Sequence, residues 1–319
     1  MTRLCLSQAT RERLVESGLD VVITGASGWL GLATLEMLES TLGSEFSSKV
    51  HAFASTARVL PLRTGTVLQA RSLEELPSMK VGPHLLVHYA FSTREFVSQL
   101  GTVDYVSRNQ EITSLVADHL AAGAAQGVVV LSSGAVYLGD DLEANPYGVL
   151  KARDEEVFMN LANELANSTN TRLVIPRLFN LAGPFLNKPD RYVLGSVIED
   201  VLRGGPIRLS AARPVFRSYV HVADLVDLCF AILLGDGPVP DGPFDTAGER
   251  EVEVGELAEI VARTLGRPDI PIERPPIDPT NSDRYVGDGT MMHNLAREYG
   301  LKLKDLVQQI EDTARFMGA

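Results

Sequence analysis

The chain has 319 residues, of which 45% are hydrophobic, and a formal net charge of −12 at pH 7. This composition excludes a disordered chain and leaves enough apolar side chains for one large domain or two small ones. The charge argues against binding to nucleic acid or to an anionic membrane, since both interactions depend on positive charge. With two cysteines, no export signal and no long apolar segment, we expect a cytoplasmic protein whose partner is a small molecule.

From Asp20 onward, short apolar runs alternate with longer helical patterns, which is typical of a parallel sheet with crossover helices. The expected strands cover residues 21–23, 50–54, 66–68, 85–87, 128–131 and 172–175. The expected helices of this region cover residues 29–42, 104–124 and 146–166. These elements predict an α/β fold with a Rossmann-type, doubly wound parallel sheet.

Beyond about residue 180, proline and glycine become frequent and short strands mix with helices, which we expect near residues 191–203, 222–234, 253–266 and 303–316. The sequence therefore predicts three parts. Residues 1–19 form an N-terminal extension with a short packing helix, and residues 20–180 form a dinucleotide-binding domain. Residues 181–319 form a smaller, mainly substrate-binding α/β lobe, whose elements can interleave with the first domain.

A glycine-spaced turn lies between the first expected strand and the first long helix. Its three glycines, three residues apart, match the dinucleotide fingerprint in its G-x-x-G-x-x-G form. Such a turn lets the backbone approach a pyrophosphate at a helix N-terminus and lets the helix pack closely on the strand. The context of strand before and helix after supports this interpretation. The predicted cofactor contacts in the turn are Gly25, Ser27, Gly28, Trp29, Leu30 and Gly31.

The end of the second strand bears on the identity of the dinucleotide. An NAD site usually places a carboxylate there, to bind the adenosine ribose. No Asp or Glu occurs between Phe46 and Leu73, and Ser55, Thr56 and Arg58 follow the expected strand end. Hydroxyls and a guanidinium suit a 2′-phosphate, so the sequence favours NADP(H) over NAD(H). The alternative is that Arg58 is a solvated loop charge.

Tyr147 and Lys151 stand four residues apart on an expected helix, so they lie on one face of it. An ammonium beside a phenol favours the phenolate and lowers the phenol pKa, which lets Tyr147 take a hydroxyl proton. The pair alone could be an ordinary exposed helix pair. The glycine turn and the segment Ser133-Gly134-Ala135-Val136-Tyr137 favour the catalytic interpretation.

With these residues placed, the chain resembles the extended short-chain dehydrogenase/reductase family, and within it the nucleotide-sugar epimerase/dehydratase group. The resemblance rests on several motifs in the family's order: His88-Tyr89-Ala90-Phe91, Asn109, Ser132 to Tyr137, Tyr147 with Lys151, Pro176 to Pro184, and Arg217 to Asp224. It implies Ser133, Tyr147 and Lys151 as catalytic residues. It implies further cofactor contacts from Tyr89, Ala90, Phe91, Asn109, Tyr147, Lys151 and Pro176, and substrate contacts from Ser133, Asn180 and Arg217.

Departures from the family narrow the expected chemistry. Members that dehydrate the sugar resemble each other in having Asp-Glu directly after the serine position, where this chain has Gly134 and Ala135. Members that epimerise carbons 3 and 5 have a cysteine at the place of Ala135. What remains is hydride and proton transfer at C4, by a 4-keto reductase or a 4-epimerase. The loop 138–146 is shorter than is usual for sugar-nucleotide epimerases, which leaves the identity of the sugar open.

Local charge is consistent with a diphosphate substrate. Between Arg177 and Arg217 there are seven basic and three acidic residues, so this segment is basic in an otherwise acidic chain. Guanidinium groups bind phosphate oxygens in a bidentate manner. We therefore expect a nucleoside-diphosphate sugar as substrate, with scattered surface arginines as the alternative explanation.

Further expectations concern metals, assembly and other functions. No Cys, His and Asp residues have zinc-like spacing, so we expect no metal. The family resemblance and the apolar residues of the helix over 104–124 predict a homodimer. Two other functions remain open: an NADPH-dependent reductase of a small non-nucleotide carbonyl, and a catalytically silent NADP(H)-binding regulator.

Overall fold

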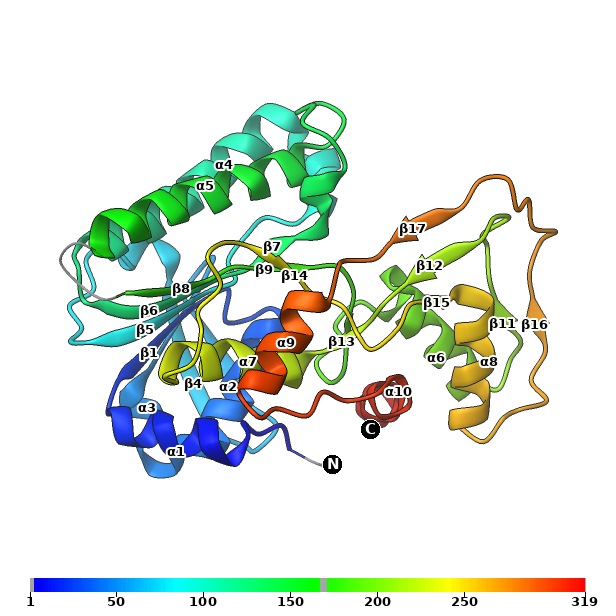
Figure 1. Cartoon of the computed structure of the whole chain (residues 1–319), viewed down its shortest axis with the longest axis horizontal. Helices are drawn as coiled ribbons and strands as arrows, with labels where there is room; N and C mark the ends of the chain where they lie inside the picture. The colour runs from blue at the N-terminus through cyan, green and yellow to red at the C-terminus, as the bar shows by residue number, and fades with distance from the viewer. Residues whose placement is uncertain (1–2, 167–170, 319) are drawn as a thin grey trace. The chain divides into compact units, whose positions relative to one another are not determined.

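The computed structural model describes residues 3–166 and 171–318 (Figure 1). The chain forms two compact units. The larger unit contains Arg3–Arg177 and Val226–Phe244, and the smaller contains Leu178–Leu225 and Asp245–Ala319. The chain thus passes from one unit to the other three times. The binding roles expected for the ranges 20–180 and 181–319 stay predictions.

The larger unit is built on a seven-stranded sheet with the order β3-β4-β2-β1-β5-β6-β8. All pairs are parallel except the edge pair of β3 and β4. The strands are β1 (Asp20–Thr24), β2 (Val50–Ala54), β3 (Arg58–Pro61), β4 (Val67–Ser72), β5 (His84–His88), β6 (Ala125–Val130) and β8 (Arg172–Val174). The predicted doubly wound α/β fold is confirmed.

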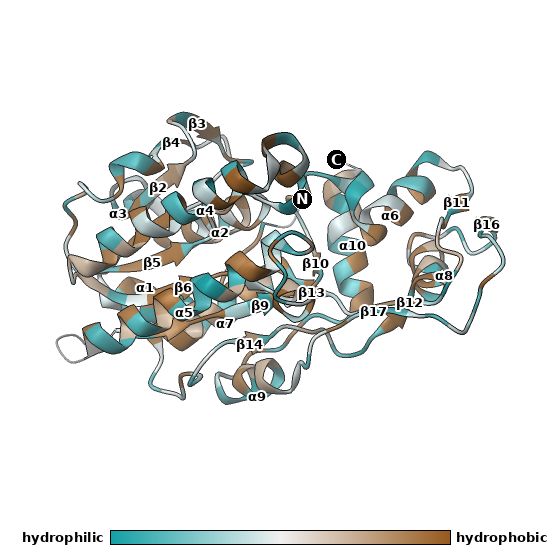
Figure 2. Ribbon diagram, turned by 90° about the horizontal axis from the view of Figure 1, so that it is seen from above, coloured by the Kyte–Doolittle hydropathy of each residue, from teal (hydrophilic) through white to brown (hydrophobic). Residues whose placement is uncertain are grey.

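Helices cover both faces of this sheet, with α4 and α5 on one face and α2 on the other (Figure 1). They are α1 (Gln8–Ser17), α2 (Trp29–Leu42), α3 (Phe46–Lys49), α4 (Val97–Ala121), α5 (Pro146–Ala166) and most of α7 (Val222–Leu234). Helix α7 is hydrophobic around most of its circumference (Figure 2) and almost wholly buried, as expected for an internal helix. In this sheet β1 lies between β2 and β5, so the chain continues on one side of β1 with β2 and later on the other side with β5. This reversal creates a switch point at the carboxyl ends of β1 and β5, which is where open α/β sheets bind ligands.

Helix α4 differs from the expected range 104–124. It begins at Val97 and contains a break at Gly101, whose φ of 76° is not helical. Its apolar residues mostly serve the core of the larger unit, because Val116 and Leu120 are buried and Ile112 packs against the same core. Helix α4 therefore leaves less apolar surface for contact with a second copy of the chain than the sequence pattern indicated. The homodimer stays a prediction.

The N-terminal extension is anchored to the larger unit. Leu6 and Leu14 are buried, and the Ser7 amide and hydroxyl both donate to the Asp227 carboxylate of α7, at 2.9 and 3.2 Å. The short packing helix expected over residues 1–19 is α1.

The smaller unit packs α6 (Val193–Arg203), α8 (Val254–Thr264) and α10 (Leu306–Met317) around one core. Its short strands are β10 (Leu181–Ala182), β11 (Ile207–Arg208), β12 (Val215–Arg217), β13 (Val220–His221), β15 (Val252–Glu253), β16 (Ile272–Glu273) and β17 (Asp283–Tyr285). Helix α9 (Thr290–Glu298) and strand β3 were not expected from the sequence. The remaining short strands are β7 (Ser132–Ser133), β9 (Pro176–Leu178) and β14 (Phe244–Asp245).

A buried ion pair holds the start of the larger unit together. Glu36 of α2 is 1% exposed, accepts the Leu4 amide at 2.8 Å and pairs with the Arg63 guanidinium. Removing one partner of a buried pair leaves an uncompensated charge, which costs far more than an exposed pair contributes.

We therefore expect Arg63→Ala to lower the free energy of unfolding by about 3 kcal/mol. Urea titration followed by circular dichroism measures this value. Arg13→Ala is the matched control, because Arg13 pairs with Asp236 on the exposed surface and exposed pairs contribute about 0–1 kcal/mol. Equal losses in the two variants would contradict the role assigned to Arg63.

Candidate functional site

The glycine turn lies at the carboxyl end of β1, and two of its glycines, Gly25 and Gly31, have a steric reason. Gly25 has a φ of 71°, and a Cβ there would lie 2.7 Å from the Ala90 nitrogen. Gly28 is the N-cap of α2. A Cβ at Gly31 would overlap the Gly25 carbonyl oxygen. The Ala26 amide donates to the Phe53 carbonyl at 3.0 Å, which connects the turn to the end of β2.

This turn fits the pyrophosphate of a dinucleotide. The first N–H groups of a helix have no partner within the helix and attract anions. Trp29 and Leu30 are the first residues of α2, and Ser27 stands in the turn just before it. The absence of side chains at the three glycines leaves the backbone accessible where a pyrophosphate binds.

The end of β2 carries the residues expected to distinguish NADP from NAD. Ser55 and Arg58 are exposed, and the Arg58 guanidinium donates to the Thr56 hydroxyl at 3.0 Å. The other bases near this strand have structural partners: Lys49 pairs with Asp20, Arg63 with Glu36, and Arg71 stacks on Phe53 at 4.5 Å. Among the described residues, Arg58 is thus the base in this stretch with no acidic or aromatic partner.

Thr24 holds the backbone at the carboxyl end of β5 in place. The Thr24 hydroxyl accepts the Ala90 amide at 3.3 Å and lies 2.7 Å from His88 Nδ1, and the Thr24 carbonyl accepts the Tyr89 amide at 3.2 Å. Burial, together with the nearby charge of Lys151, lowers the pKa of His88 to about 3. His88 is therefore a neutral core histidine, and the backbone of residues 89–91 follows it beside the glycine turn.

Asn109 lies in the middle of α4 and is 1% exposed. Its side chain accepts the Ser92 amide at 2.8 Å and donates to the Tyr105 carbonyl at 3.1 Å. Asn109 thus fixes the loop that follows β5. The expected contact between Asn109 and a cofactor stays a prediction, as does that of Pro176, the first residue of β9.

Phe91 brings the predicted catalytic helix to the strand end of β5. The Tyr147 ring meets the Phe91 ring edge-on, with 5.4 Å between centroids. The Lys151 ammonium lies 3.8 Å from the centroid of the same ring and donates to the Leu131 carbonyl at 2.8 Å. Both residues of the predicted pair therefore pack on one aromatic ring at the edge of the predicted cofactor site.

Lys151 has an unusual environment for a lysine. It is 3% exposed, and burial lowers its pKa to about 8, although Asp154, at 3.8 Å, acts in the opposite direction. At neutral pH the ammonium is still charged. It can therefore stabilise an anionic neighbour in a site that excludes much of the water.

Ser133 lies at the end of β7 and is 6% exposed. It is the N-cap of the 3₁₀ turn Gly134–Tyr137, because its Oγ accepts the Ala135 amide at 3.2 Å. This turn is followed by the loop that leads into α5. Ser133, Tyr147 and Lys151 thus all belong to the larger unit.

Asn145 and Gly148, which the sequence analysis missed, set the position of α5 against the serine turn. The Asn145 side-chain Nδ2 donates to the carbonyls of Ala135 and Gly139, at 2.9 and 3.0 Å, and its Oδ1 accepts the Gly148 backbone amide at 3.1 Å. A Cβ at Gly148 would overlap the Ala135 carbonyl oxygen. The dipeptide Asn145-Pro146 was the available signal, because Asn at the N-cap followed by Pro begins many helices.

Glu155, also missed, makes a second connection between α5 and the serine segment. It is 4% exposed, accepts the Ser132 hydroxyl and forms a bidentate pair with Arg177, at 2.8 and 2.7 Å. Arg177 also donates to the Tyr137 hydroxyl at 2.6 Å. The Arg177 guanidinium is therefore committed to a structural network.

Two of the predicted substrate residues, Asn180 and Arg217, lie in the smaller unit, whereas Ser133 lies in the larger one. Asn180 donates to the carbonyls of Ser218 and Tyr285, at 3.1 and 3.2 Å. Arg217 has a side chain 16% exposed and forms a bidentate pair with Asp283, at 3.2 and 3.1 Å. Both residues thus already make contacts within the protein.

The basic patch expected over residues 177–217 needs correction. Acidic residues from other parts of the chain neutralise much of it: Glu155 pairs with Arg177, Glu273 with Arg208, and Asp283 with both Arg213 and Arg217. Counting charges along one segment could not detect these partners. A phosphate at Arg217 would have to compete with Asp283.

Residues 3–166 and 171–318 contain no group of three or more His, Cys, Asp or Glu side chains placed to hold a metal ion. No helix within those ranges combines the length and the apolar character needed to cross a membrane.

The glycine turn generates a direct binding test. Because a Cβ at residue 31 would displace the turn, we expect Gly31→Ala to raise the dissociation constant of the dinucleotide by about tenfold or more. Fluorescence titration with NADPH and with NADH measures both constants, and the wild-type pair of values reports the effect of the 2′-phosphate. Gly82→Ala is the control, since a Cβ at Gly82 meets nothing within 4 Å. Unchanged binding by Gly31→Ala would contradict the cofactor site.

Comparison with known proteins identifies the family. The model of the NAD dependent epimerase/dehydratase family matches residues 21–241. UDP-glucuronic acid decarboxylase 6 of Arabidopsis thaliana is 31% identical over 140 residues, covering 42% of this chain and 40% of that protein. UDP-glucuronic acid decarboxylase 5 of the same plant is 32% identical over 140 residues, with the same coverage. This chain thus matches about two fifths of the length of these curated relatives.

Solved structures share the fold. UDP-glucose 4-epimerase of Thermotoga maritima, in complex with UDP-glucose, has a TM-score of 0.70 at 17% identity, covering 94% of this chain and 98% of the other. MoeE5 in complex with UDP-glucose and NAD has a TM-score of 0.69 at 21% identity, covering 93% and 98%. The family match spans the glycine turn, the serine segment and the Tyr147–Lys151 pair, and it confirms the resemblance found in the sequence: the chain belongs to the NAD dependent epimerase/dehydratase family.

Proposed function

We propose that the protein is an NAD(P)-dependent oxidoreductase or epimerase that acts at C4 of a nucleotide-linked sugar. The observation that carries this proposal is the packing of Tyr147 and Lys151 on Phe91, next to the glycine turn. The names of the relatives support it, since they are UDP-glucuronic acid decarboxylases and enzymes bound to UDP-sugars. Gly134 and Ala135 in place of Asp-Glu argue against dehydration.

The proposed residue roles follow from position and charge. The nicotinamide cofactor, when bound, accepts or supplies the hydride at C4. Tyr147 removes or returns the proton of the C4 oxygen, and the Lys151 ammonium lowers the pKa of the Tyr147 phenol and holds the nicotinamide ribose. Ser133 orients the reacting oxygen through a hydrogen bond. The glycine turn binds the pyrophosphate, with Ser55 and Arg58 at a 2′-phosphate, so NADP(H) is the favoured cofactor.

The choice between reductase and epimerase can be made with substrates. A preference for NADP(H) points to a 4-keto reductase, whereas an epimerase retains its cofactor between turnovers. Incubation with 4-keto-6-deoxy nucleotide sugars and NADPH tests the first reaction, and incubation with UDP-sugars without added cofactor tests the second. Turnover of neither substrate class would contradict the proposed function.

One observation favours a second candidate function, the reduction of a small non-nucleotide carbonyl. Arg217 is already paired with Asp283, which weakens the argument for a diphosphate site. On the leading proposal, the substrate diphosphate displaces Asp283 from the Arg217 guanidinium. On the alternative, this pair is purely structural.

Substitution of Tyr147 tests the proton carrier. Tyr147→Phe removes the transferable proton and keeps the ring that packs on Phe91, so we expect kcat to fall by roughly 10²–10⁴-fold with little change in cofactor binding. Ser133→Ala removes one hydrogen bond and no proton carrier, and we expect it to cost less. Steady-state kinetics with the substrate found above measures both. Near-full turnover by Tyr147→Phe would refute this catalytic assignment.

The lowered pKa of Lys151 predicts a pH dependence of cofactor binding. Lys151 is charged below its pKa of about 8 and loses its proton above it, so binding should weaken several-fold as the pH rises through 8. Lys151→Arg keeps its charge in this range, so its dissociation constant should stay level between pH 7 and about pH 10. Fluorescence titrations across pH give both profiles, and identical profiles would contradict the role of Lys151.

Arg217 separates the two candidate functions. If Arg217 binds a diphosphate, Arg217→Gln should raise the Michaelis constant for the nucleotide sugar by about tenfold or more and change kcat less, because the contact is remote from the reacting carbon. Arg203→Gln is the matched control, since Arg203 pairs with Glu199 on an exposed helix surface. An unchanged Michaelis constant in Arg217→Gln would favour the small-carbonyl reductase.

A further inference from the structure

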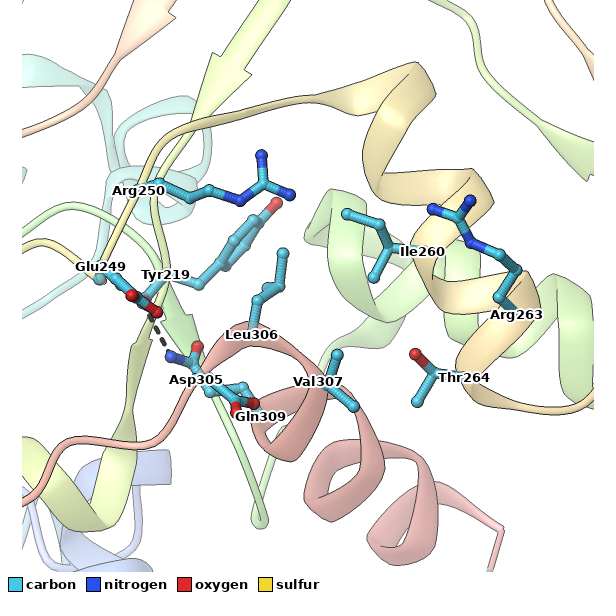
Figure 3. A pocket seen from close by; sticks show the side chains of 11 residues that line it. Tyr219, Glu249, Arg250, Ile260, Arg263, Thr264, Asp305, Leu306, Val307 and Gln309 are labelled. Carbon is cyan, nitrogen blue, oxygen red and sulfur yellow. Dashed lines mark hydrogen bonds between the residues drawn. The ribbon is translucent and has the colours of Figure 1, made fainter.

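Buried charged side chains are concentrated in one turn of α5. Among the described residues, the Lys, Arg, Asp and Glu side chains that are buried are Glu36, Lys151, Asp154 and Glu155. By contrast, the charged side chains that line the pocket between α8 and the first turn of α10 (Figure 3) are all exposed: Glu249, Arg250, Arg263 and Asp305. Water screens exposed charges, whereas a buried charge must be balanced by a partner.

Asp154 and Lys151 balance each other. Asp154 is 5% exposed, and its Oδ1 accepts the hydroxyl of Thr113 on α4 at 2.6 Å. Its Oδ2 accepts no hydrogen bond from any described residue and lies 3.8 Å from the Lys151 ammonium. The ammonium donates to the Leu131 carbonyl, which carries no charge. The Asp154 carboxylate is therefore held by α4 on one side and compensated by Lys151 on the other.

The neighbouring groups cannot replace Asp154 in this pair. Besides Tyr147, the titratable groups that face the pair are Glu155 of α5, His88 of β5 and Tyr105 of α4. Glu155 already forms a bidentate pair with Arg177. Burial lowers the pKa of His88 to about 3 and raises the pKa of Tyr105 above its usual range, so both are neutral. Among the described residues, Asp154 is thus the carboxylate left to balance Lys151.

The charge of Lys151 depends on this partner. Removal of an ammonium from water lowers its pKa, and for Lys151 burial outweighs the opposite effect of Asp154. An opposite charge at this distance raises the pKa of an ammonium by about one to two units. Without the Asp154 carboxylate, the pKa of Lys151 would therefore fall from about 8 to near or below neutral pH.

We propose that Asp154 is a positioning residue that keeps Lys151 protonated at neutral pH and thereby sets the upper pH limit of cofactor binding. Asp154 acts through Lys151 and does not itself touch the cofactor. Thr113 fixes the orientation of the carboxylate, so α4 takes part in holding the charge of the site. The inference rests on the function proposed above, because it requires Lys151 to contact the cofactor.

The titration of Lys151 tests the pairing without any cofactor. The chain has six lysines, so protein labelled with ¹³C in its lysine side chains gives few NMR signals, and the Lys151 signal is the one missing from Lys151→Arg. In Asp154→Asn we expect the midpoint of this signal to fall by about one to two pH units from a wild-type value of about 8. An unchanged midpoint would overturn the proposal, as would a wild-type midpoint near the ordinary lysine value of about 10.4.

Two further variants guard this test. Asparagine keeps the size of the side chain and an oxygen for the Thr113 hydroxyl, so we expect Asp154→Asn to fold. Asp154→Ser removes the same charge with a smaller side chain, and its Lys151 midpoint should fall similarly. Glu156→Gln is the matched control, since Glu156 is exposed on the same helix and its loss should leave the midpoint unchanged. A shift in Glu156→Gln as large as in Asp154→Asn would overturn the proposal.

Fluorescence titration with NADPH across pH separates this inference from the proposed function. We expect the pH at which binding weakens to fall in Asp154→Asn by the same one to two units, about as far as the Lys151 signal moves. A shifted Lys151 signal with an unchanged binding profile would overturn the link to cofactor binding and contradict the role proposed for Lys151. An unshifted signal, with wild-type binding that still weakens near pH 8, would overturn the inference about Asp154 alone.

Discussion

The placement of the proposed catalytic helix depends on one buried carboxylate. Glu155 lies one turn beyond Lys151 on α5 and binds Ser132 and Arg177 at the same time. It therefore connects the helix, the serine segment and the start of β9 through charged hydrogen bonds in a water-poor interior. Such bonds are short and directional, and losing one partner leaves a charge that the interior cannot solvate. The geometry of Ser133 and Tyr147 follows from this constraint together with the Asn145 cap.

Much of the larger unit could be predicted because its signals are local. Helix α2 runs over the predicted residues 29–42, since Gly28 and Gly43 stand at its two ends and the pattern between them is apolar. The buried strands β1 and β2 are short apolar runs, and such runs require no knowledge of their neighbours. The family motifs have the same local character, which is why the fold class and the family could be predicted before the structure.

The contacts that the sequence did not indicate share a different physical cause. Arg217 pairs with Asp283, 66 residues later in the chain, and the Asn109 side chain accepts the amide of Ser92, 17 residues earlier. Neither partner can be identified from the residues around Arg217 or Asn109. A short helical segment precedes the expected start of α4, because Gly101, with a φ of 76°, breaks the helix just before residue 104. Gly148 shows the same limit, since its need for a missing side chain depends on the position of the Ala135 carbonyl.

The path of the chain has a consequence for how such a protein can be divided. Residues 226–244 return to the larger unit after the chain has built part of the smaller one, and α1 is anchored on Asp227 in that returning segment. No single cut can therefore release the larger unit intact. A fragment ending near residue 180 would lack a core helix and expose the apolar surface that α7 covers. Gene fusion or exchange of the smaller unit must preserve three crossings at once, which favours divergence by substitution over exchange of whole units.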